Sequence, residues 1–371
     1  MLLSIIIPTK NRYTTLFSVV DMILSFNLNN DIEIVIQDNS DDNKEALDFT
    51  DQRVNYNNLK YFHSSENLSV IGNSDKAVLN STGEFVCFIG DDDGVMPNIV
   101  EVTKWMKENS YKALKSYKPS YYWPNQKSNY LSNDTSGVFK YKKWKENSFQ
   151  VIKTNEALDF TLKHGGVSIK LLPCLYHGIV ERKTLDIIYH KANTFFPGPS
   201  PDMANAVALT QVIDSYVFVK YPVIISGKST KSTGGAGVLH QHVARIEDVG
   251  HLPKETSANW DKRIPKYWTG PTIWAESVIK ALEIFQNKEA VKKLNFEYLY
   301  AYLYVFYKKQ SKEIFKGFVI NKSLKFSKLK CDIFILRIRV FILNRIGSVK
   351  QVNSLKNIQS AVEIVSKIQN S

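Results

Sequence analysis

The first 110 residues alternate between short apolar runs and segments with helical periodicity. Four apolar runs have the length and β-branched content of buried strands: 2–7, 32–37, 59–63 and 85–89. Apolar residues recur at helical spacing in 14–26 and 70–79, and Pro97 suits the first turn of a helix that ends near Lys107. Strands that alternate with helices predict right-handed βαβ units and a mostly parallel sheet with helices on both faces.

The pattern changes after residue 117. Residues 118–150 are rich in Tyr, Trp, Asn, Lys and Ser with weak periodicity, which predicts an inserted loop or small ribbon. Helical spacing returns at 154–163, and Ser200 followed by Pro201 is typical of a helix start. Residues 216–226 are strand-like, and the chain after Pro271 reads as mostly helical.

Polar clusters follow three of the four predicted strands. They lie at 9–12 after the first strand, 38–40 after the second and 91–93 after the fourth. Ligands bind beyond the carboxyl ends of the strands in open α/β sheets. The sequence therefore predicts that these three clusters meet at one edge of the sheet and form a binding site there.

Residues 91–93 are three consecutive aspartates. Like charges a few ångströms apart repel and raise one another's pKa, and a divalent cation removes that penalty by accepting carboxylate oxygens as ligands. Mg²⁺ or Mn²⁺ would also bridge a diphosphate and neutralise the charge that develops on it. The alternative is a solvated acidic turn, or a charge cluster at the start of the helix after Pro97.

Cysteine content and charge narrow the class of protein. The three cysteines form no CxxC pair, so a disulfide framework and a thiolate zinc site are not expected, and a reducing compartment fits. The first eight residues are too short for a signal peptide and read as a strand. The formal net charge is +12, and residues 301–350 alone hold twelve Lys and Arg against Glu313 and Asp332, a net charge of +10.

Four motifs in residues 1–110 carry a family resemblance. They are Ser4–Arg12 (SIIIPTKNR), Glu33–Ser40 (EIVIQDNS), Asn67–Asn73 (NLSVIGN) and Gly83–Asp93 (GEFVCFIGDDD). With these motifs the chain resembles inverting family 2 glycosyltransferases of the bacterial polysaccharide-biosynthesis type. The resemblance implies a GT-A fold with a Rossmann-like sheet. It divides the chain into a catalytic domain, 1–240, with a nucleotide-binding half (1–110) and an acceptor half (111–240), and a helical, basic region, 241–371.

The resemblance also implies roles for single residues. The nucleotide pocket would be lined by Pro8, Thr9, Asn11 and Arg12, although a polar turn after a strand explains such residues singly. Asp38 would accept hydrogen bonds from the base. Asn67 and Asn73 would flank the base and ribose. Asp91 or Asp92 would meet the ribose or the donor sugar, and Asp93 would hold the Mn²⁺ or Mg²⁺ ion, with Asp91 as a second ligand.

An inverting transfer needs a base to deprotonate the acceptor hydroxyl. The family usually supplies a carboxylate at the start of a helix downstream of the acidic motif, and Asp202 fits that location, shaped by Gly198 and three prolines. The alternative is a carboxylate that merely favours the helix N-terminus. Asp214 and Glu181 are the rival bases.

Residues 227–235 are rich in Gly, Ser and Thr but lack the GxxxxGK[ST] order, which excludes a Walker phosphate loop. We expect a lid that closes on the diphosphate, with Lys228 or Lys231 and His240 or His242 touching phosphate or metal. A solvated loop with surface histidines is the alternative.

The basic C-terminal stretch interleaves aromatic, aliphatic and basic residues. No run approaches the roughly 20 apolar residues that span a bilayer. Two interpretations remain: a basic amphipathic helix on an anionic membrane surface, or a helix that packs its apolar face on the catalytic domain. The first fits an enzyme at the inner face of the cell membrane, and both fit a cytoplasmic protein.

The leading hypothesis is an enzyme of the hexosyltransferase type. It would transfer one sugar from a UDP-sugar to a saccharide or lipid-linked saccharide acceptor, in O-antigen or capsule synthesis. The alternatives are a sugar-phosphate nucleotidyltransferase, a catalytically inactive sugar-binding relative and a nucleic-acid-binding protein. The first lacks a glycine-rich loop after the first strand, and the last lacks a recognisable motif.

Overall fold

The computed structural model describes residues 1–124, 136–145, 147–230, 243–320, 324–345 and 349–369. Its strands are β1 (Leu3–Thr9), β2 (Ile32–Asp38), β3 (Leu59–His63), β4 (Phe85–Phe88), β5 (Gly94–Val95), β6 (Ala113–Tyr117), β7 (Ser120–Tyr122), β8 (Val138–Tyr141), β9 (Phe149–Lys153), β10 (Gly178–Glu181), β11 (Ser215–Pro222), β12 (Ile224–Lys228) and β13 (Lys350–Val352).

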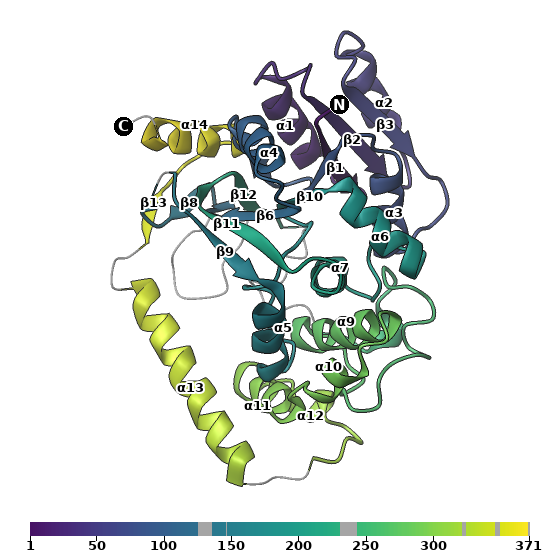
Figure 1. Ribbon diagram of the computed structural model, residues 1–371, viewed down its shortest axis with the longest axis vertical. Helices are drawn as coiled ribbons and strands as arrows, with labels where there is room; N and C mark the ends of the chain where they lie inside the picture. Colours follow the sequence, from purple (N-terminus) through teal and green to yellow (C-terminus); the bar gives the residue numbers. More distant parts are fainter. Residues whose placement is uncertain (125–135, 146, 231–242, 321–323, 346–348, 370–371) are drawn as a thin grey trace.

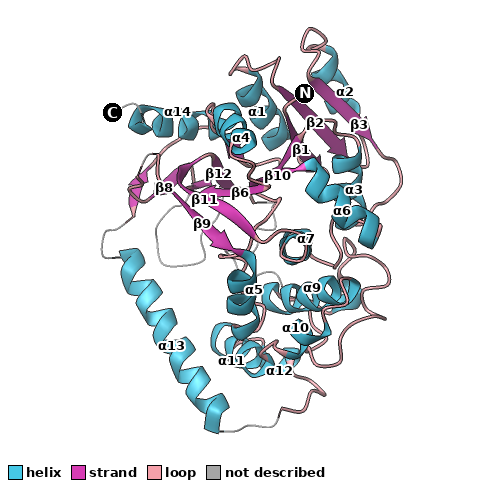
Figure 2. Ribbon diagram, viewed as in Figure 1, coloured by secondary structure: helices cyan, strands magenta, loops and turns pink. Residues whose placement is uncertain are grey.

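Helices cover both faces of the sheet and build the lower part of the molecule (Figures 1 and 2). They are α1 (Tyr13–Leu24), α2 (Lys44–Asp51), α3 (Val70–Leu79), α4 (Ile99–Glu108), α5 (Thr154–Lys163), α6 (Arg182–Ala192), α7 (Pro201–Leu209), the 3₁₀ turn η1 (Ile246–Asp248), α9 (Gly270–Ile284), α10 (Lys288–Lys292), α11 (Phe296–Phe306), α12 (Ser311–Ile314), α13 (Leu324–Arg345) and α14 (Ile358–Gln369).

The large sheet has the order β3-β2-β1-β4-β10-β6-β11-β9. The pairs within β3-β2-β1-β4 are parallel, β10 runs antiparallel to both β4 and β6, and β6 is parallel to β11. The predicted α/β class, with a GT-A-like, mostly parallel sheet and a helical C-terminal region, is confirmed. The polar insert at 118–150 forms the short strands β7, β8 and β9, so the ribbon interpretation is correct.

Alternate residues of the buried strands belong to different cores, as a sheet covered on both faces requires. Leu3, Ile5 and Ile7 pack with α1 and α4, whereas Ile6 packs on the opposite face with α3 and α6. A third core joins α5 and α7 to the helices after Pro271.

The end of the chain returns to the first strand and helix. Strand β13 pairs with β8, and α14 buries Ile358, Val362 and Val365 in the same core as β1 and α1. Figure 1 shows α14 beside α1 and α4, far along the chain from both. The boundary at residue 240 stays a prediction, and the contacts of α14 cross it.

A buried carboxylate, Glu33, ties the first strands together. It accepts hydrogen bonds from Ser4 Oγ at 2.6 Å and from Thr82 N at 2.5 Å, and Lys60 Nζ lies 2.5 Å away. Burial opposes the charge, but Lys60 and the hydrogen bonds outweigh it and lower the pKa of Glu33 to about 2.

Glu33→Gln should therefore make the unfolding free energy depend less on pH in the acid range. Because the folded-state pKa is depressed, the stabilisation by Glu33 is complete above the unfolded value near 4.5 and is lost as pH falls towards 2. We expect the variant to lose roughly 3 kcal/mol of unfolding free energy at pH 7 and much less near pH 2. Urea unfolding at both pH values measures this, and an equal loss at both would contradict the role of the charge.

Candidate functional site

Topology brings the ends of several strands to one edge of the large sheet. Parallel strands β1, β2 and β4 all end there, and β6 ends at the same edge because two antiparallel steps separate it from β4. Antiparallel β10 begins there, directly after His177. Residues that follow β1, β2, β4 and β6 or precede β10 are thus neighbours, as the sequence predicted for the first three strands.

The three aspartates after β4 are buried and turn to different partners. Asp91 accepts a hydrogen bond from Thr9 Oγ1 at 2.6 Å, and Arg12 Nη2 lies 2.5 Å from its other oxygen. Burial raises the pKa of Asp91 to about 7, although Arg12 opposes that shift. Asp92 accepts a hydrogen bond from Ser229 N at 2.8 Å.

Asp93 is surrounded by donors. Its Oδ1 accepts from Gly227 N, and its Oδ2 accepts from Gly90 N, both at 2.7 Å, and from the hydroxyl of Tyr176 at 3.2 Å. The ring of His177 approaches Oδ2 to 2.5 Å. Burial by itself raises the pKa of Asp93, but His177 and the hydrogen bonds bring it below its ordinary value.

A lysine extends this contact into a chain of three side chains. Lys118 Nζ lies 2.6 Å from His177 Nδ1. An ammonium group can only donate, so Nδ1 accepts and the proton of a neutral ring sits on Nε2, where it is donated to Asp93. Burial lowers the pKa of His177, which agrees with a neutral imidazole. Sequence reasoning missed His177 and Lys118, because nothing in either local sequence marks them.

The predicted nucleotide-pocket residues lie at this edge. Thr9 is buried, Arg12 is partly buried, and Asn73 donates a hydrogen bond to Thr9 O at 3.3 Å. Asn11 has a left-handed backbone (φ 58°) and bonds to Asp41. Pro8, the last residue but one of β1, is half-buried beside them.

The two remaining pocket residues are held by neighbours. Asp38 is fully buried and accepts from the hydroxyls of Tyr13 at 2.6 Å and Tyr61 at 2.7 Å and from Ser40 N. Asn67 is exposed and accepts from Lys10 Nζ at 2.7 Å. The polar side chains of Asp38 and Asn67 are therefore held in place by the protein itself.

Asp202 lies in the first turn of α7 and is half-buried. Its Oδ1 accepts from Ser200 Oγ and from Met203 N, while its Oδ2 takes no hydrogen bond from the described residues. Cys174, three residues before His177, contacts the backbone carbonyl of Asp202. The charge of Asp202 acts on Lys118. Asp202 therefore belongs to the neighbourhood of Lys118 and His177.

The rival bases lie at the other edge of the sheet. Glu181 ends β10 opposite Phe85, the first residue of β4, and bonds to Thr184. Asp214 immediately precedes β11, which runs parallel to β6, so it also lies at the edge away from Asp91. The predicted lid residues Lys231, His240 and His242 lie outside the described residues, and Lys228 donates to the hydroxyl of Tyr122 at 3.2 Å.

The side chains of the site supply only some of the ligands that a divalent cation needs. A Cβ on Gly90 would lie 3.0 Å from Asp93 Oδ2 and 3.2 Å from both Asp92 Oδ1 and the hydroxyl of Tyr176, so three oxygens border the space that the glycine leaves. In the described part of the chain, no three His, Cys, Asp or Glu side chains form a ready metal site. Mg²⁺ commonly takes one or two carboxylates and completes its shell with substrate phosphates and water, so the donor set fits a cation that binds together with a diphosphate.

The backbone of β12 touches the aspartates directly, and only glycine permits that approach at position 227. A Cβ there would lie 1.6 Å from the carbonyl oxygen of Asp92. Gly227→Ala should therefore push β12 off the acidic turn and lower the unfolding free energy by about 2 kcal/mol or more. Gly250→Ala is the matched control, since nothing lies within 4 Å of its Cβ. Urea unfolding of both variants measures the difference, and equal stability would contradict the contact.

Comparison with known proteins gives one family match. Residues 4–160, less than half of the chain, match the model of the family described as Glycosyl transferase family 2. This stretch includes Thr9, Arg12, the three aspartates and Lys118, but ends before His177 and Asp202. No curated protein matches the chain.

Several solved structures resemble the chain at low identity. The crystal structure of S. aureus TarS 1-349 has a TM-score of 0.46 at 11% identity, over 85% of this chain and 89% of that one. Its complex with UDP-GlcNAc has 0.45 at 12% identity with the same coverage. The mannosyltransferase PcManGT from Pyrobaculum calidifontis, in complex with GDP-Man and Mn2+, has 0.42 at 15% identity over 99% of this chain and 86% of that one. Residues 4–160 are thus similar to family 2 glycosyltransferases, and the sheet that they begin is of the predicted type.

Proposed function

We propose that this protein transfers a sugar, with inversion, from a UDP-sugar to a hydroxyl of a saccharide or lipid-linked saccharide. The process it would serve is surface polysaccharide synthesis, of the O-antigen or capsule kind. The observation that carries the proposal is the convergence of the aspartates, Arg12 and the Lys118–His177 pair at the carboxyl edge of the sheet. A nucleoside diphosphate needs such a combination of cations and cation-binding carboxylates.

The donor would lie along the ends of β1, β2 and β4. Asn67 and Asn73 would lie beside the base and ribose, and Pro8, Thr9 and Asn11 would shape the pocket wall. Asp38 is the expected acceptor for the base, but it is fully buried and accepts from Tyr13, Tyr61 and Ser40, so its role here is to hold these neighbours in place. Arg12 reaches the diphosphate in this arrangement, because its guanidinium is partly exposed while its partner Asp91 is buried. Asp91 and Asp92 would face the ribose and the donor sugar.

A Mn²⁺ or Mg²⁺ ion would be held by Asp93, and it would neutralise charge on the departing diphosphate. We had expected Asp91 as its second ligand. The hold of Thr9 and Arg12 on Asp91 makes Asp92 the better candidate, since Asp92 Oδ1 and Asp93 Oδ2 border the same space beside Gly90. His177 keeps the Asp93 carboxylate charged and oriented.

Asp202 is the proposed base. Its Oδ1 is fixed by Ser200 and Met203, which leaves Oδ2 to take the proton of the acceptor hydroxyl as that oxygen attacks the anomeric carbon. Attack from the face opposite the leaving diphosphate inverts the configuration.

Turnover of a panel of nucleotide-sugars with Mn²⁺ tests this function. Asp202→Asn should lower kcat by a factor of about 10² to 10⁴ with little change in UDP affinity, because a base acts in the transition state. Asp93→Ala should abolish the metal-dependent rate. Both are measured as released UDP, alongside UDP binding.

Two outcomes would count against the assignment. A near wild-type rate in Asp202→Asn would require another base, and full activity of the wild type in EDTA would remove the metal from the mechanism. Asp214→Asn is the control, since that carboxylate lies at the opposite edge of the sheet.

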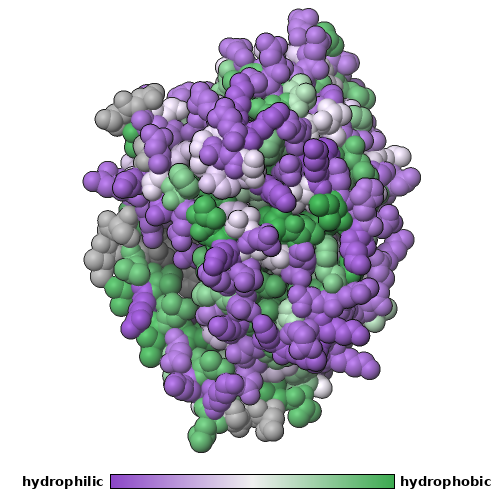
Figure 3. All heavy atoms as spheres, viewed as in Figure 1, coloured by the Kyte–Doolittle hydropathy of each residue, from purple (hydrophilic) through white to green (hydrophobic). Residues whose placement is uncertain are grey.

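Helix α13 is the proposed contact with an anionic membrane at the inner face of the cell membrane. It was expected to be amphipathic, but apolar residues are distributed all around it. Phe326 and Ile333 pack against α11, whereas the second half, which also carries Arg337 and Arg339, exposes Phe334, Leu336 and Leu343. Figure 3 shows hydrophobic atoms gathered at the lower left, where α13 runs. In the described residues no helix has the length and apolar character to cross a bilayer.

Point substitutions test this contact better than deletion, because removing residues 310–371 would also remove α14 from the core. Phe334→Ser with Leu343→Ser should weaken binding to phosphatidylglycerol vesicles about tenfold or more. The reason is that the variant lacks two exposed apolar side chains that would be buried in the lipid. Leu47→Ser with Leu79→Ser, equally exposed on α2 and α3, should leave binding unchanged. Co-sedimentation measures both, and equal binding of the two variants would refute the contact.

A further inference from the structure

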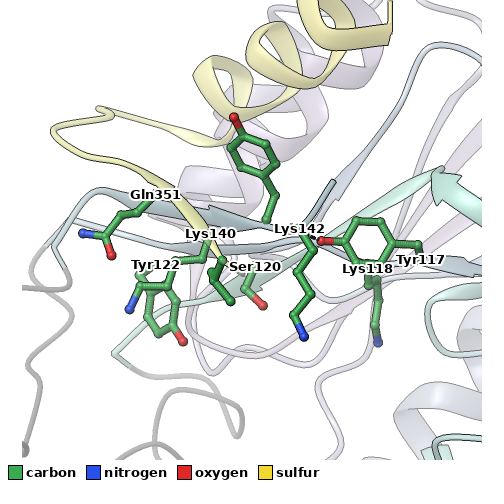
Figure 4. Close-up of a pocket in the computed structure, with 9 residues that line it drawn as sticks. Tyr117, Lys118, Ser120, Tyr122, Lys140, Lys142 and Gln351 are labelled. Carbon is green, nitrogen blue, oxygen red and sulfur yellow. Dashed lines mark hydrogen bonds between the residues drawn. The ribbon is translucent and has the colours of Figure 1, made fainter. Parts of the chain in front are cut away.

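A cavity of about 340 Å³ opens on the small five-stranded sheet. Its lining comes from β7, β8 and β13 and from the turn after β6. Figure 4 shows the side chains of Lys118, Lys142 and Tyr122 directed to the same side of this sheet. The proposed donor site leaves this cavity unexplained.

Strand register fixes which side chains face the cavity. Ser120 pairs with Lys140, and Lys140 pairs with Gln351, so these three form one row across β7, β8 and β13. Side chains alternate along a strand, and the intervening row, Tyr121 with Phe139, is buried in the core. A slip by one residue would bury lysine and expose aromatic rings, so the core locks the polar row outwards.

The cavity is basic and has no internal counter-charge. Lys118, Lys140 and Lys142 line it, and its described lining contains no acidic residue. Within the described chain none of these lysines forms an ion pair with a carboxylate. Lys140 instead lies over the ring of Tyr122, 5.2 Å from its centre. Lys140 and Lys142 place two cations without a carboxylate partner in one hollow, and such cations attract an anionic ligand.

Tyrosines give the cavity flat, amphipathic walls beside the lysines. Tyr122 has Lys140 over its ring, and its hydroxyl accepts from Lys228 Nζ. Tyr117 is fixed because its hydroxyl accepts from Lys142 N at 2.5 Å. Rigid aromatic faces suit the apolar C–H face of a sugar ring, while lysines suit a phosphate or a carboxylate.

Lys118 connects this cavity to the reaction site. It lines the cavity, yet its Nζ contacts His177 Nδ1, and the charges of Asp93 and Asp202 both act on it. A molecule in the cavity that reaches Lys118 therefore has its end beside the His177–Asp93 pair.

We propose that this cavity binds the acceptor, and that the acceptor is an anionic saccharide whose phosphate or carboxylate is held by Lys140 and Lys142. The proposal rests on the proposed transferase function and adds the chemical class of its acceptor. Lys118 then marks the end of the cavity at which the reacting hydroxyl lies, and Gln351 contributes the wall supplied by the last part of the chain.

Binding of three matched probes to the full chain tests the proposal without any turnover. The probes are maltotriose, maltotriose bearing one phosphate and maltotriose bearing one carboxylate. We expect one or both charged probes to bind at least tenfold more tightly than the neutral one, and the two arms identify the anion. Lys140→Gln with Lys142→Gln should remove that advantage, since each charge-assisted contact contributes substantially to affinity.

Lys143→Gln with Lys145→Gln is the control, because it removes the same charge from neighbouring exposed lysines outside the cavity lining and should keep the advantage. Equal affinity for all three probes, or an equal loss in both double variants, would overturn the proposal. UDP binding is measured in parallel. If UDP and the charged probes lose affinity together, the lysines serve the donor diphosphate and the acceptor assignment fails. If anion binding depends on Lys140 and Lys142 but no nucleotide-sugar is turned over, the transferase function fails instead.

Discussion

Three adjacent carboxylates at the end of a buried strand can be kept together only if each finds its own donors. The fold meets this constraint by sending them to three different segments. Asp91 turns to the end of β1, Asp92 to the backbone after β12, and Asp93 to Gly90, Gly227 and the residues before β10. Most of the donors are backbone N–H groups or side chains fixed at strand ends, so the acidic turn also ties the end of β1 to β12 and to the residues before β10.

The same constraint determines the electrostatics around the turn. Burial alone would protonate such carboxylates, and it does raise the pKa of Asp91. The pKa of Asp93 shifts the other way, because His177 faces it and Lys118 faces His177. The pKa of Asp91 is thus raised, whereas the pKa of Asp93, two residues along the chain, is lowered. Opposed shifts in adjacent titratable groups are typical of functional sites, although structural ion pairs produce them too.

The sequence predicted the part of the fold in which local pattern and topology agree. Strands and helices of the first 110 residues have strong periodicity, and the residues after β1, β2 and β4 meet because parallel strands must end at one edge. It missed α2, whose eight residues bury only Ala46 and Phe49. It also missed Lys118 and His177, which reach the edge only because β10 runs antiparallel between β4 and β6. That reversal depends on tertiary pairing and leaves no local signal.

The return of the chain end links two regions that the sequence treats as separate. Helix α13 ends at Arg345 and β13 begins at Lys350, so five peptide steps, at most about 18 Å of chain, join them. Strand β13 supplies Gln351 to the basic cavity, and α14 then anchors the segment in the core of β1. If α13 contacts a membrane, at most about 18 Å of chain would therefore join the membrane-bound helix to the strand that lines the cavity. A lipid-linked acceptor requires that closeness, because its saccharide must reach Lys118 while its lipid stays in the bilayer. The two proposals are thus coupled by one short connection.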